Sequence, residues 1–559
     1  MSKLIFNFSS KKIKKIKDAK NLLGGKGFNL SEMGRMGLPV PPGFTISTKV
    51  CDLFYKNSKK LNHKITTMIK EELKKTEKES NKKFGDLENP LLVSVRSGAR
   101  VSMPGMMDTI LNLGLNDKTV IALAKKTSNP RFAKDSYRRF IQMYSSVVMG
   151  VKSYNFEELI ENYKLTKGVL LDTDLDENDW DDLIQDFKRV IKENTNKDFP
   201  QNVYEQLFGA ISAVFLSWES KRAKVYRKLN QIPSNWGTAV NVQSMVFGNM
   251  GNDCATGVVF TRSPSDGTNY IYGEYLINAQ GEDVVAGTRT PQYISKKSCK
   301  DISSEKKSME RLMPHTFKQL KKILNKLEKH YRDMQDVEFT VENNKLWMLQ
   351  TRSGKRTAKS AVKIAVDMVK EKLITKKEAV LRIDPNLLDN LLHPTLNEKK
   401  EINVIASGLP ASPGAVSGKV VFTSEEAERL NNMMQDTILV RIETSPEDIH
   451  GMHASKGILT SRGGMTSHAA VVARGMGRPC VSGSSEIDIN YEEKIFRTSN
   501  IEVKEGDIIT IDGSTGRIIL GEVETIKPEI SGSFSTLMSW ADKFRKLKIR
   551  TNSETPLDT

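Results

Sequence analysis

Cysteine is scarce in this sequence. Only four are present among 559 residues, and no two of them form a CxxC pair. This spacing excludes a disulfide framework and offers no zinc-ribbon pattern, so it favours a reducing compartment. Cys480 is the cysteine nearest to a histidine of interest, and we interpret it as a small buried residue rather than a nucleophile.

Long apolar runs are also absent. No stretch of about 18 apolar residues occurs, which argues against a membrane-spanning helix. The N-terminus is basic but has neither an apolar core nor a small-residue cleavage site, so we expect no secretory signal. Together these absences predict a cytoplasmic protein that has no membrane partner.

Acidic residues are fewer than basic ones. The 85 lysines and arginines exceed the 68 aspartates and glutamates, which gives a net charge of +17. The lysines are scattered over predicted helices such as 59–83 and 318–329, and acidic residues lie between them. No zinc-finger spacing or RNA-binding aromatic string accompanies them. We therefore expect a solvated lysine surface and no nucleic-acid partner.

One histidine stands in a distinctive context, the string SRGGMTSHAAVVARGMGRPCVSG at residues 461–483. Gly463 and Gly464 permit a close approach of the backbone to a ligand. Thr466 and Ser467 are residue types that cap helix N-termini, so His468 is predicted to lie in the first turn of a short helix. A helix N-terminus attracts a phosphoryl group and keeps imidazole neutral and nucleophilic.

The residues alone leave two interpretations of His468 open, a nucleophile or a capping and packing residue. The string around it resembles the phosphohistidine motif of the pyruvate phosphate dikinase and PEP synthase family. That resemblance implies that His468 carries phosphate from an ATP site to a distant pyruvate site. It also implies that Thr466 is a regulatory phosphorylation site, with a regulatory kinase and phosphorylase as partners.

Two further segments carry the resemblance. NLLGGKGFNLSEMGRMGLPVPPGF, at 21–44, predicts a glycine turn and a helix from about Asn29 to Met36, and Lys26 in the turn suits a phosphate contact. LLVSVRSGARVSMPGMMDT, at 91–109, predicts a buried strand that ends near Arg96, whose guanidinium can bind phosphate oxygens, and a loop able to close over a triphosphate. This loop resembles the dikinase branch of the family and not PEP synthase.

Residues 236–287 read as strands, and the resemblance is to an ATP-grasp fold, in which ATP lies between two α+β lobes. The resemblance implies an adenine edge in the inter-lobe linker, formed by Gln243, Met245 and Val246. It places Glu274 near the ribose or adenine, and Glu282 with Asp283 near the phosphates. A solvated or capping role for these three acids is the alternative.

The string QDVEFTVENNKLWMLQTR, at 335–352, predicts a β-hairpin. Alternation places Asp336 and Glu338 on one face. A three-residue turn at 342–344 would place Gln350 opposite Asp336, and would put Trp347 and Leu349 on the apolar face.

This pattern gathers two carboxylates, the Gln350 amide and Arg352 on one polar face. Carboxylates two residues apart suit Mg²⁺ shared with phosphate oxygens, and the arginine suits transition-state charge. An ordinary exposed hairpin face is the alternative. The resemblance makes Asp336 and Glu338 the metal ligands and Arg352 and Gln350 contacts of ATP.

The expected fold class is α+β and multidomain. We expect an ATP-grasp nucleotide-binding domain at 1–354 with a helical insertion at about 115–230, and a helical linker at 355–404. A swivelling β/β/α phosphohistidine domain would occupy 405–524. Residues 525–559 would hold a second linker helix and the first strand of the family's C-terminal barrel, the remainder of which, with the pyruvate site, is not in this sequence.

The family reaction begins when the histidine takes the β-phosphoryl group of MgATP and releases AMP. Inorganic phosphate then removes the terminal phosphoryl group as pyrophosphate, and the remaining phosphate passes to pyruvate and gives PEP. We expect this chain to carry out only the ATP- and phosphate-dependent phosphorylation of His468. The alternatives are a phosphocarrier module that acts with a separate barrel subunit, and a PEP synthase-like enzyme.

Overall fold

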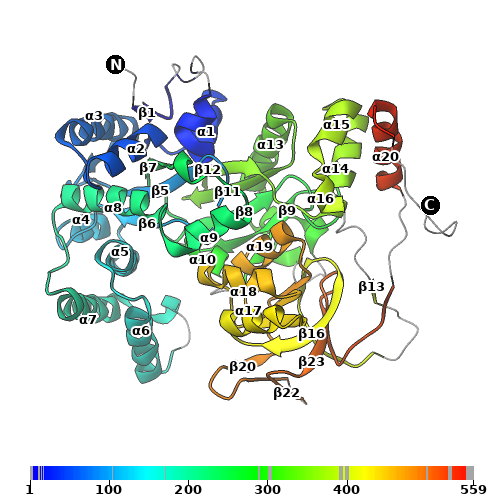
Figure 1. Cartoon of the computed structure of the whole chain (residues 1–559). Coiled ribbons are helices and arrows are strands. Elements are labelled where there is room, and N and C mark those ends of the chain that lie inside the picture. The colour runs from blue at the N-terminus through cyan, green and yellow to red at the C-terminus, as the bar shows by residue number, and fades with distance from the viewer. Residues whose placement is uncertain are drawn as a thin grey trace, which may run out of the picture.

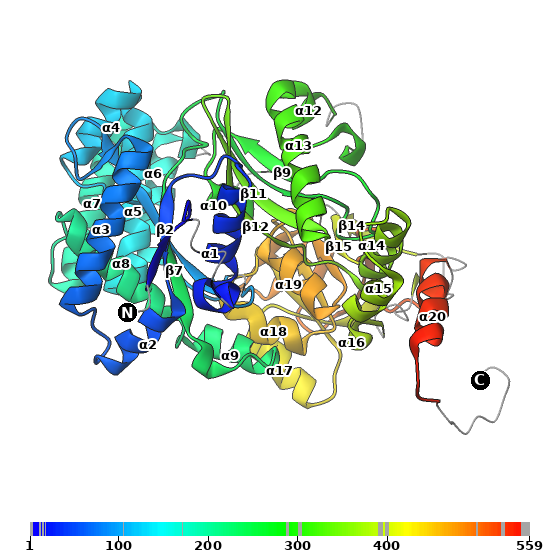
Figure 2. The ribbon, with the colours of Figure 1, turned by 90° about the horizontal axis from the view of Figure 1, so that it is seen from above.

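The computed structural model describes residues 4–10, 13, 16, 18–103, 105–169, 172–286, 290–299, 305–388, 395–396, 402–498, 501–526 and 532–548. Within these ranges the chain forms two five-stranded sheets and one eight-stranded sheet, each packed against helices (Figures 1 and 2). The expected α+β multidomain class is confirmed. Among the described helices, none combines the length and apolar character that crossing a membrane requires.

The first sheet has the order β1-β2-β7-β5-β6, and its described neighbours are all antiparallel. Its strands are β1 (Ile5–Asn7), β2 (Gly43–Ile46), β5 (Val93–Ala99), β6 (Thr109–Leu113) and β7 (Thr238–Ser244). The helices of this part are α1 (Ala19–Arg35), α2 (Thr48–Lys56), α3 (His63–Ser80), α4 (Thr119–Thr127), α5 (Pro130–Tyr144), α6 (Tyr154–Lys167), α7 (Glu177–Thr195), α8 (Val203–Ser217) and α9 (Lys221–Leu229). A π-helical turn, Ser145–Met149, follows α5.

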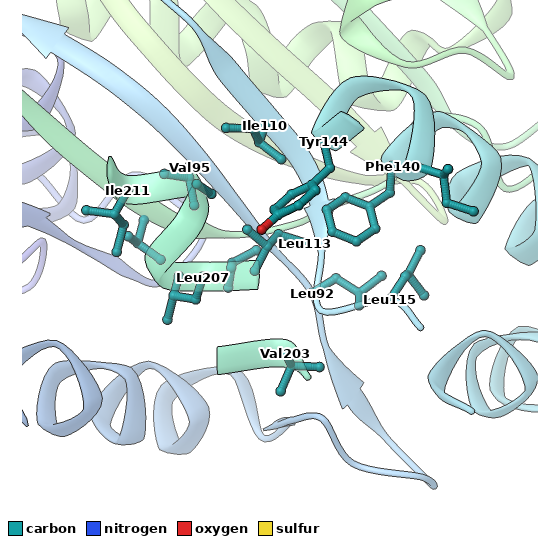
Figure 3. Close-up of a cluster of buried hydrophobic side chains, with 14 of the residues drawn as sticks. Leu92, Val95, Ile110, Leu113, Leu115, Phe140, Tyr144, Val203, Leu207 and Ile211 are labelled. Atoms are coloured by element: carbon teal, nitrogen blue, oxygen red, sulfur yellow. The ribbon is translucent and has the colours of Figure 1, made fainter. Parts of the chain in front are cut away.

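The core of this part lies between the sheet and the helices α5 and α8. Apolar strand residues such as Val95 and Ile110 face Phe140 of α5 and Leu207 of α8 (Figure 3). All four side chains are fully buried. Burial of this size stabilises each element by roughly 1.5–3 kcal/mol per large apolar side chain.

Helix α1 begins ten residues earlier than the sequence predicts. The GGKG string does not precede the helix but forms a kink within it, where Gly24 has φ +69°. A Cβ atom at Gly24 would lie 1.7 Å from the carbonyl oxygen of Gly98 in β5, so only glycine fits. The kink places Lys26 in the first turn after it, directly beside β5.

The second sheet has the order β10-β9-β8-β11-β12. Its strands are β8 (Ala255–Phe260), β9 (Tyr272–Ile277), β10 (Gln292–Tyr293), β11 (Gln335–Glu342) and β12 (Lys345–Ser353). Helices α10 (Gly281–Ala286), α12 (Met309–Leu312) and α13 (Pro314–Tyr331) accompany it. A small pair, β3 (Lys83–Phe84) with β4 (Pro90–Leu91), lies elsewhere.

The β11–β12 hairpin exists, but its predicted register is wrong. Asn343 and Asn344 both have positive φ and form a two-residue turn, not a three-residue one. A bulge after Glu338 then shifts the pairing, so Gln350 lies opposite Glu338 and Arg352 lies opposite Asp336.

The same bulge changes which β12 side chains face the core. Met348 pairs with Phe339 and is fully buried, whereas Leu349 lines a cavity and Trp347 is half-buried. The extra residue in β12, Leu349, therefore leaves Gln350 and Arg352 on the polar face. It also places Met348, instead of Trp347 and Leu349, in the apolar core.

Residues 402–526, here called the eight-stranded unit, hold the sheet β14-β24-β23-β16-β17-β18-β19-β15. These strands are β14 (Val404–Ser407), β15 (Leu409–Ser412), β16 (Ala415–Val421), β17 (Thr437–Arg441), β18 (Gly457–Thr460), β19 (Cys480–Ser482), β23 (Ile508–Asp512) and β24 (Arg517–Leu520). The helices are α17 (Ser424–Asn432), α18 (Ile449–Ala454) and α19 (His468–Met476). A three-stranded sheet contains β20 (Asp488–Asn490), β21 (Ile495–Arg497) and β22 (Glu502–Lys504).

The strands β16, β17, β18 and β19 are parallel neighbours. Helix α19 is the crossover between β18 and β19, so its N-terminus lies beyond the carboxyl end of β18. Ligands of open α/β sheets bind at such strand ends. His468, the first residue of α19, therefore stands where the sheet topology favours a site.

Two connections join the eight-stranded unit to the rest. The first contains α14 (Ala358–Lys370), α15 (Lys376–Arg382) and α16 (Pro385–Leu388), and the second contains α20 (Ser533–Phe544). Helix α20 packs on α14 and α15 through buried Leu537 and Trp540 (Figure 1). The short strands β13 (Thr395–Leu396) and β25 (Thr525–Ile526) also pair. The predicted barrel strand near 548–551 lies outside the described residues from 549 onward.

Candidate active site

A cavity of about 970 Å³ lies between the two five-stranded sheets and the eight-stranded unit. Its walls come from α1, from the loop between β5 and β6, from the hairpin β11–β12, and from the start of α19. Several sequence-predicted residues line it: Lys26, Arg96, Gln243, Met245, Val246, Asp336, Glu338, Gln350, Arg352, Gly463, Thr466, Ser467 and His468. Segments up to 440 residues apart in the sequence therefore share one enclosure.

His468 is the first residue of α19, as predicted. Ser467 is the N-cap, and its Oγ accepts a hydrogen bond of 3.4 Å from the backbone N–H of Ala470. Nδ1 of the His468 ring lies 3.0 Å from Oγ1 of Thr444. Nε2 is buried and has no hydrogen-bond partner in the described part of the chain. One ring nitrogen is thus anchored, and the other is left for a ligand in the cavity.

The imidazole is held neutral. Burial lowers the pKa of His468 to about 4, although the carboxylates of Asp448 and Glu447 act in the opposite direction. The sequence predicted a neutral ring from the field of the helix N-terminus, but the main physical cause is desolvation. A neutral ring at pH 7 has a lone pair on one nitrogen, and with Nδ1 as the N–H donor to Thr444 that lone pair lies on Nε2.

The loop between β5 and β6 lies against this ring. Gly105 has φ +70°, and a Cβ atom there would lie 3.3 Å from Cδ2 of His468. Met103 and Met107 of the same loop also line the cavity. Met106 is fully buried in a cluster that includes Leu439 and Ala470 of the eight-stranded unit. The loop that the sequence predicts to be a lid therefore also forms part of the contact between the units.

A network of ion pairs occupies the polar face of the hairpin. Nε of Arg352 donates to Oδ2 of Asp336 at 2.7 Å. Nη2 of Arg96 donates to Oε2 of Glu338 at 2.7 Å, and Nε2 of Gln350 donates to Oε1 of Glu338 at 2.9 Å. The amide of Gln350 retains an unpartnered Oε1, and Asp336 retains an unpartnered Oδ1, among the described residues. The charged side chains are thus held in place, with spare atoms for a ligand.

The pKa values reflect this crowding. Burial opposes ionisation of Glu338, but Arg96, Lys26 and Arg352 together lower its pKa to about 2. Burial, assisted by the positive charge of Arg96, lowers the pKa of Lys26 well below its ordinary value. Burial raises the pKa of Asp336, against the opposing charge of Arg352. Three cations beside two carboxylates leave a local excess of positive charge, which suits a polyanion.

Part of the cavity wall is apolar. Leu111, Met245, Val258 and Val284 are among the residues that line it. Gln243 is buried, and its Nε2 donates to the carbonyl oxygen of Pro41 at 3.4 Å. The cavity therefore offers both charged and apolar surface, an arrangement that suits a nucleotide with its phosphates at the hairpin.

Glu274, which the sequence predicts to lie near the ribose or adenine, is not among the residues that line the cavity. Its carboxylate accepts hydrogen bonds from the backbone N–H of Met465 at 3.2 Å and from Oγ1 of Thr466 at 3.1 Å. Gly464 lies so close that a Cβ atom there would be 2.4 Å from Oε2 of Glu274. Glu274 of the second sheet thus holds the loop that precedes His468. Burial raises the pKa of this carboxyl group, against the hydrogen bonds from Met465 and Thr466.

Asp283 is also placed differently from the prediction. Its Oδ1 accepts from Nη1 of Arg139 in α5 at 2.8 Å, and its Oδ2 accepts from the backbone N–H of Gln280 at 2.8 Å. It does not line the cavity, because it ties α10 to α5. The backbone of Glu282 lies in α10, but its side chain lies outside the described part of the chain.

Comparisons with known proteins agree with this geometry. The family model "Pyruvate phosphate dikinase, AMP/ATP-binding domain" matches residues 20–83, 61–302 and 294–373, and "PEP-utilising enzyme, mobile domain" matches 433–516. The chain belongs to the pyruvate phosphate dikinase family. The resemblance carried by the sequence motifs is therefore confirmed.

Individual relatives are similar over nearly the whole chain. A pyruvate, phosphate dikinase of Clostridium symbiosum is 58% identical over 543 residues, which cover 97% of this chain and 61% of the relative. One of Rhizobium meliloti (strain 1021) is 54% identical over 558 residues, 100% of this chain and 62% of the relative. A chloroplastic pyruvate, phosphate dikinase of Flaveria pringlei is 51% identical over 558 residues, which cover 100% of this chain and 57% of the relative. The chain thus spans about three-fifths of the length of these relatives.

Membership in the dikinase family directs attention to a divalent cation, and the hairpin carboxylates fit one. Asp336 and Glu338 project from alternate positions of β11 into the cavity, and Oδ1 of Asp336 is buried without a partner. The described residues contain no cluster of three or more His, Cys, Asp or Glu that would enclose a cation alone. Two carboxylates with an open side are the donor set that Mg²⁺ uses when phosphate oxygens and water complete its shell.

Sequence reasoning missed three contributors to this dikinase-family site. Thr444 stands in the string ETSPEDI, where nothing local marks its contact with His468. Gly105 follows a proline in a loop that the sequence predicts to close over a triphosphate. A Pro-Gly pair is typical of turns with a positive φ at the glycine, so this backbone conformation could have been predicted. Arg474, fully buried in α19, donates to the carbonyl oxygens of Ala411 and Met465. Arg474 thus holds the carbonyl group of Met465, the residue whose backbone N–H donates to Glu274.

Proposed function

We propose that this chain catalyses the ATP- and phosphate-dependent phosphorylation of His468, the first half of the pyruvate, phosphate dikinase reaction. The observation that carries the proposal is the unpartnered Nε2 of His468 in the same cavity as Lys26, Arg96, Asp336, Glu338 and Arg352. A nucleophile and a polyanion site within one enclosure are the parts that phosphoryl transfer needs.

In the proposed reaction, Nε2 of His468 attacks the β-phosphorus of ATP, and the bond to the α-phosphoryl oxygen breaks. AMP leaves with that oxygen, and a pyrophosphoryl group remains on the ring. Inorganic phosphate then attacks the terminal phosphorus, so pyrophosphate leaves and phosphohistidine remains. Thr444 holds the ring so that its lone pair is on Nε2, and Arg96, Arg352 and Lys26 bind the phosphate oxygens.

Mg²⁺ bound by Asp336 and Glu338 would neutralise phosphate charge. In the structure these carboxylates pair with Arg352 and Arg96. When Mg²⁺ and the phosphates are both bound, these pairs can be replaced: the carboxylates would bind the cation, and the arginines would bind phosphate oxygens. The protein side of this exchange costs little reorganisation, because the side chains are already aimed at the cavity.

The eight-stranded unit is proposed to move between this cavity and a second site, at which pyruvate accepts the phosphate. Support comes from the two connections that flank it. Its contact with the N-terminal part combines polar groups, such as Glu274 and the pair of Arg222 with Glu447, with the apolar cluster around Met106. The pyruvate site is proposed to lie on a C-terminal barrel, supplied by the same polypeptide or a separate one. Thr466 is the proposed target of a regulatory kinase and phosphorylase.

The test is a single-turnover assay with MgATP and inorganic phosphate. We expect AMP and pyrophosphate in amounts stoichiometric with protein, acid-labile phosphate on the protein, and neither in His468→Ala. Absence of AMP from the wild-type chain would refute the proposal. Phosphohistidine formation that does not need inorganic phosphate would instead favour a PEP synthase-like enzyme.

A second candidate function is a phosphocarrier module that hands phosphate to a separate barrel subunit. It predicts that the phosphorylated chain forms PEP only after a barrel protein and pyruvate are added. A chain that binds ATP but never forms phosphohistidine, alone or with the barrel, would be a nucleotide-binding module only.

A further inference from the structure

Two buried amides, one in the cavity wall and one behind it, have no part in the proposed phosphoryl transfer. Gln280, between β9 and α10, is 4% exposed and lines the cavity. Asn249, in the segment after β7, is 8% exposed. Nε2 of Gln280 donates a hydrogen bond of 3.4 Å to Oδ1 of Asn249. Oε1 of Gln280 and Nδ2 of Asn249 have no partner in the part of the chain that the structure describes.

A buried amide oxygen without a partner is costly, because it has lost its hydrogen bonds to water without replacement. Such atoms are uncommon in proteins and call for an explanation, of which a ligand is one. The oxygen of Gln280 belongs to a side chain that lines the cavity, so a ligand bound there can satisfy it.

The backbone around Gln280 is held on both sides. Its N–H donates to Oδ2 of Asp283 at 2.8 Å, and Asp283 is itself fixed by Arg139. The N–H of the preceding Ala279 donates to the carbonyl oxygen of Gly248 at 2.9 Å. This explains why Asp283 has no place in the cavity wall: it positions the residue that does.

In the structure Oδ1 of Asn249 faces the nitrogen of the Gln280 amide, so the oxygen of that amide is the atom without a partner. A half-turn of that amide would place its oxygen against Oδ1 of Asn249, and two acceptors repel each other. With the nitrogen committed to Asn249, the amide offers the cavity an acceptor. It therefore selects a ligand group that donates.

The surroundings define the shape of that ligand. Leu111, Met245, Val258 and Val284 line the same cavity and provide apolar surface for a flat ring, and Val284 lies in α10, which follows Gln280 directly. Val258 of β8 lies opposite Glu338 of β11, so the apolar surface is continuous with the charged face. A planar heterocycle that carries an amine, joined to a polyphosphate, matches both kinds of surface.

We propose that Oε1 of Gln280, oriented by Asn249, accepts a hydrogen bond from the exocyclic amine of adenine and sets the preference for adenine nucleotides. The proposal deepens the proposed function and rests on it, since it takes ATP as the occupant of this cavity. Guanine and hypoxanthine carry a carbonyl oxygen at the matching ring position. That oxygen would face another acceptor, so the site should reject both bases.

Equilibrium binding tests this proposal independently of turnover. The ligands are the magnesium complexes of ATP, of purine riboside triphosphate, which lacks the amine, and of inosine triphosphate. We expect the wild type to bind ATP about tenfold more tightly than purine riboside triphosphate, the worth of one such hydrogen bond. Gln280→Met should reduce this ratio to about one. Asn249→Leu should keep ATP binding but reduce the ratio of the affinities for ATP and inosine triphosphate, because the Gln280 amide can then turn and offer its nitrogen to the base.

Two further variants make the test decisive. Gln280→Glu keeps an acceptor at this position, because the Asn249 amide can turn its unpartnered Nδ2 toward the second carboxylate oxygen. This variant should keep the preference for ATP over purine riboside triphosphate, and it provides the measurement if Gln280→Met does not fold. Gln319→Met, on the exposed surface of α13, is the matched control and should behave as wild type.

The outcomes separate the two ideas. An unchanged base preference in Gln280→Met, or a lost preference in Gln280→Glu with intact folding, would overturn the role of Gln280. A wild type that shows the base preference but forms no AMP would refute the proposed function and leave the role of Gln280 standing. A wild type that binds no nucleotide would refute both.

Discussion

A Cβ atom at Gly105 would lie 3.6 Å from Nε2 of His468 and 2.9 Å from Cγ of Pro446. Position 105 also has φ +70°, a conformation that costs a residue with a Cβ atom roughly 1–2 kcal/mol. The loop between β5 and β6 therefore reaches the reactive nitrogen at a position where a hydrogen atom is the only side chain that fits. We therefore expect access of a ligand to Nε2 to depend on this residue.

Gly105→Ala should slow phosphorylation of His468 by about 10- to 100-fold, because the methyl group displaces the ring or the loop by a fraction of an ångström. Affinity for MgATP should change little, since the phosphate-binding side chains lie on other elements. Rapid-quench measurement of AMP formation and calorimetry of ATP binding would separate the two effects. Equal losses in rate and affinity would contradict this account.

Thr444→Val should lower the rate of His468 phosphorylation by about 10-fold or more, because Nδ1 loses the hydroxyl that fixes the ring tautomer. Thr444→Ser keeps the hydroxyl and should recover most of the rate. The nitrogen chemical shifts of the His468 ring report the tautomer directly. If valine and serine variants are equally impaired, Thr444 acts by packing rather than by its hydroxyl.

The buried imidazole makes phosphorylation resistant to acid. The pKa of His468 is lowered from its ordinary 6.5 to about 4 in the docked arrangement, so the neutral ring persists there as pH falls through 6.5. Docking is correspondingly weakened between pH 6.5 and 4, because the exposed ring gains a proton that the buried one does not. The single-turnover rate should therefore have its acid midpoint below 6.5.

The matched variant for this pH profile is Glu274→Ala, which removes the acceptor of the Thr466 hydroxyl and weakens docking. Its acid midpoint should move toward 6.5, because the ring spends more time in water. A wild-type midpoint at 6.5 would mean that burial of the ring does not govern its ionisation during the reaction.

Thr466→Asp should disfavour the docked arrangement, because a carboxylate would face the carboxylate of Glu274 at hydrogen-bond distance. We expect at least about a 100-fold slower phosphorylation of His468, since an unpaired buried like charge costs several kcal/mol. Glu274→Gln in the same chain should recover part of the rate. Thr466→Val, which adds no charge, is the control, and a loss as large as that of Thr466→Asp would argue against repulsion.

Asp336→Asn should reduce the rate of phosphorylation by about 100-fold or more and raise the magnesium concentration needed, because a carboxylate ligand is replaced by a neutral amide. Asp333→Asn is the comparison, since Asp333 pairs with Arg356 and does not line the cavity. A magnesium titration of AMP formation measures both. Unchanged magnesium dependence in Asp336→Asn would exclude Asp336 as a ligand.

The sequence predicted which residues gather at the hairpin but not how they pair. Alternation along β11 is a local property, so Asp336 and Glu338 could be assigned to one face from the sequence. The bulge after Glu338 has no local signature, and it decides that Arg352 rather than Gln350 lies opposite Asp336. A register is fixed by turn geometry and by packing against β8, and neither is visible in the alternation alone.

The roles of the acids in β9 and α10 could not be predicted from the sequence for another reason. Glu274 contacts a loop almost 200 residues later in the chain, and Asp283 contacts α5 about 140 residues earlier. Such contacts arise when separate units pack, so no spacing rule encodes them. The prediction that His468 begins a helix succeeded because a cap, a helical run and a glycine stop lie within ten residues of one another.

The pairing of β13 with β25 means that the chain enters and leaves the eight-stranded unit at neighbouring points, and the helices that precede and follow this pair, α14, α15 and α20, also contact one another. In its topology the unit resembles an inserted domain, because the segments that enter and leave it lie side by side. Domains with adjacent ends tolerate excision and circular permutation. His468 thus resides in a unit whose exchange between proteins would require a partner surface that covers the apolar cluster around Met106.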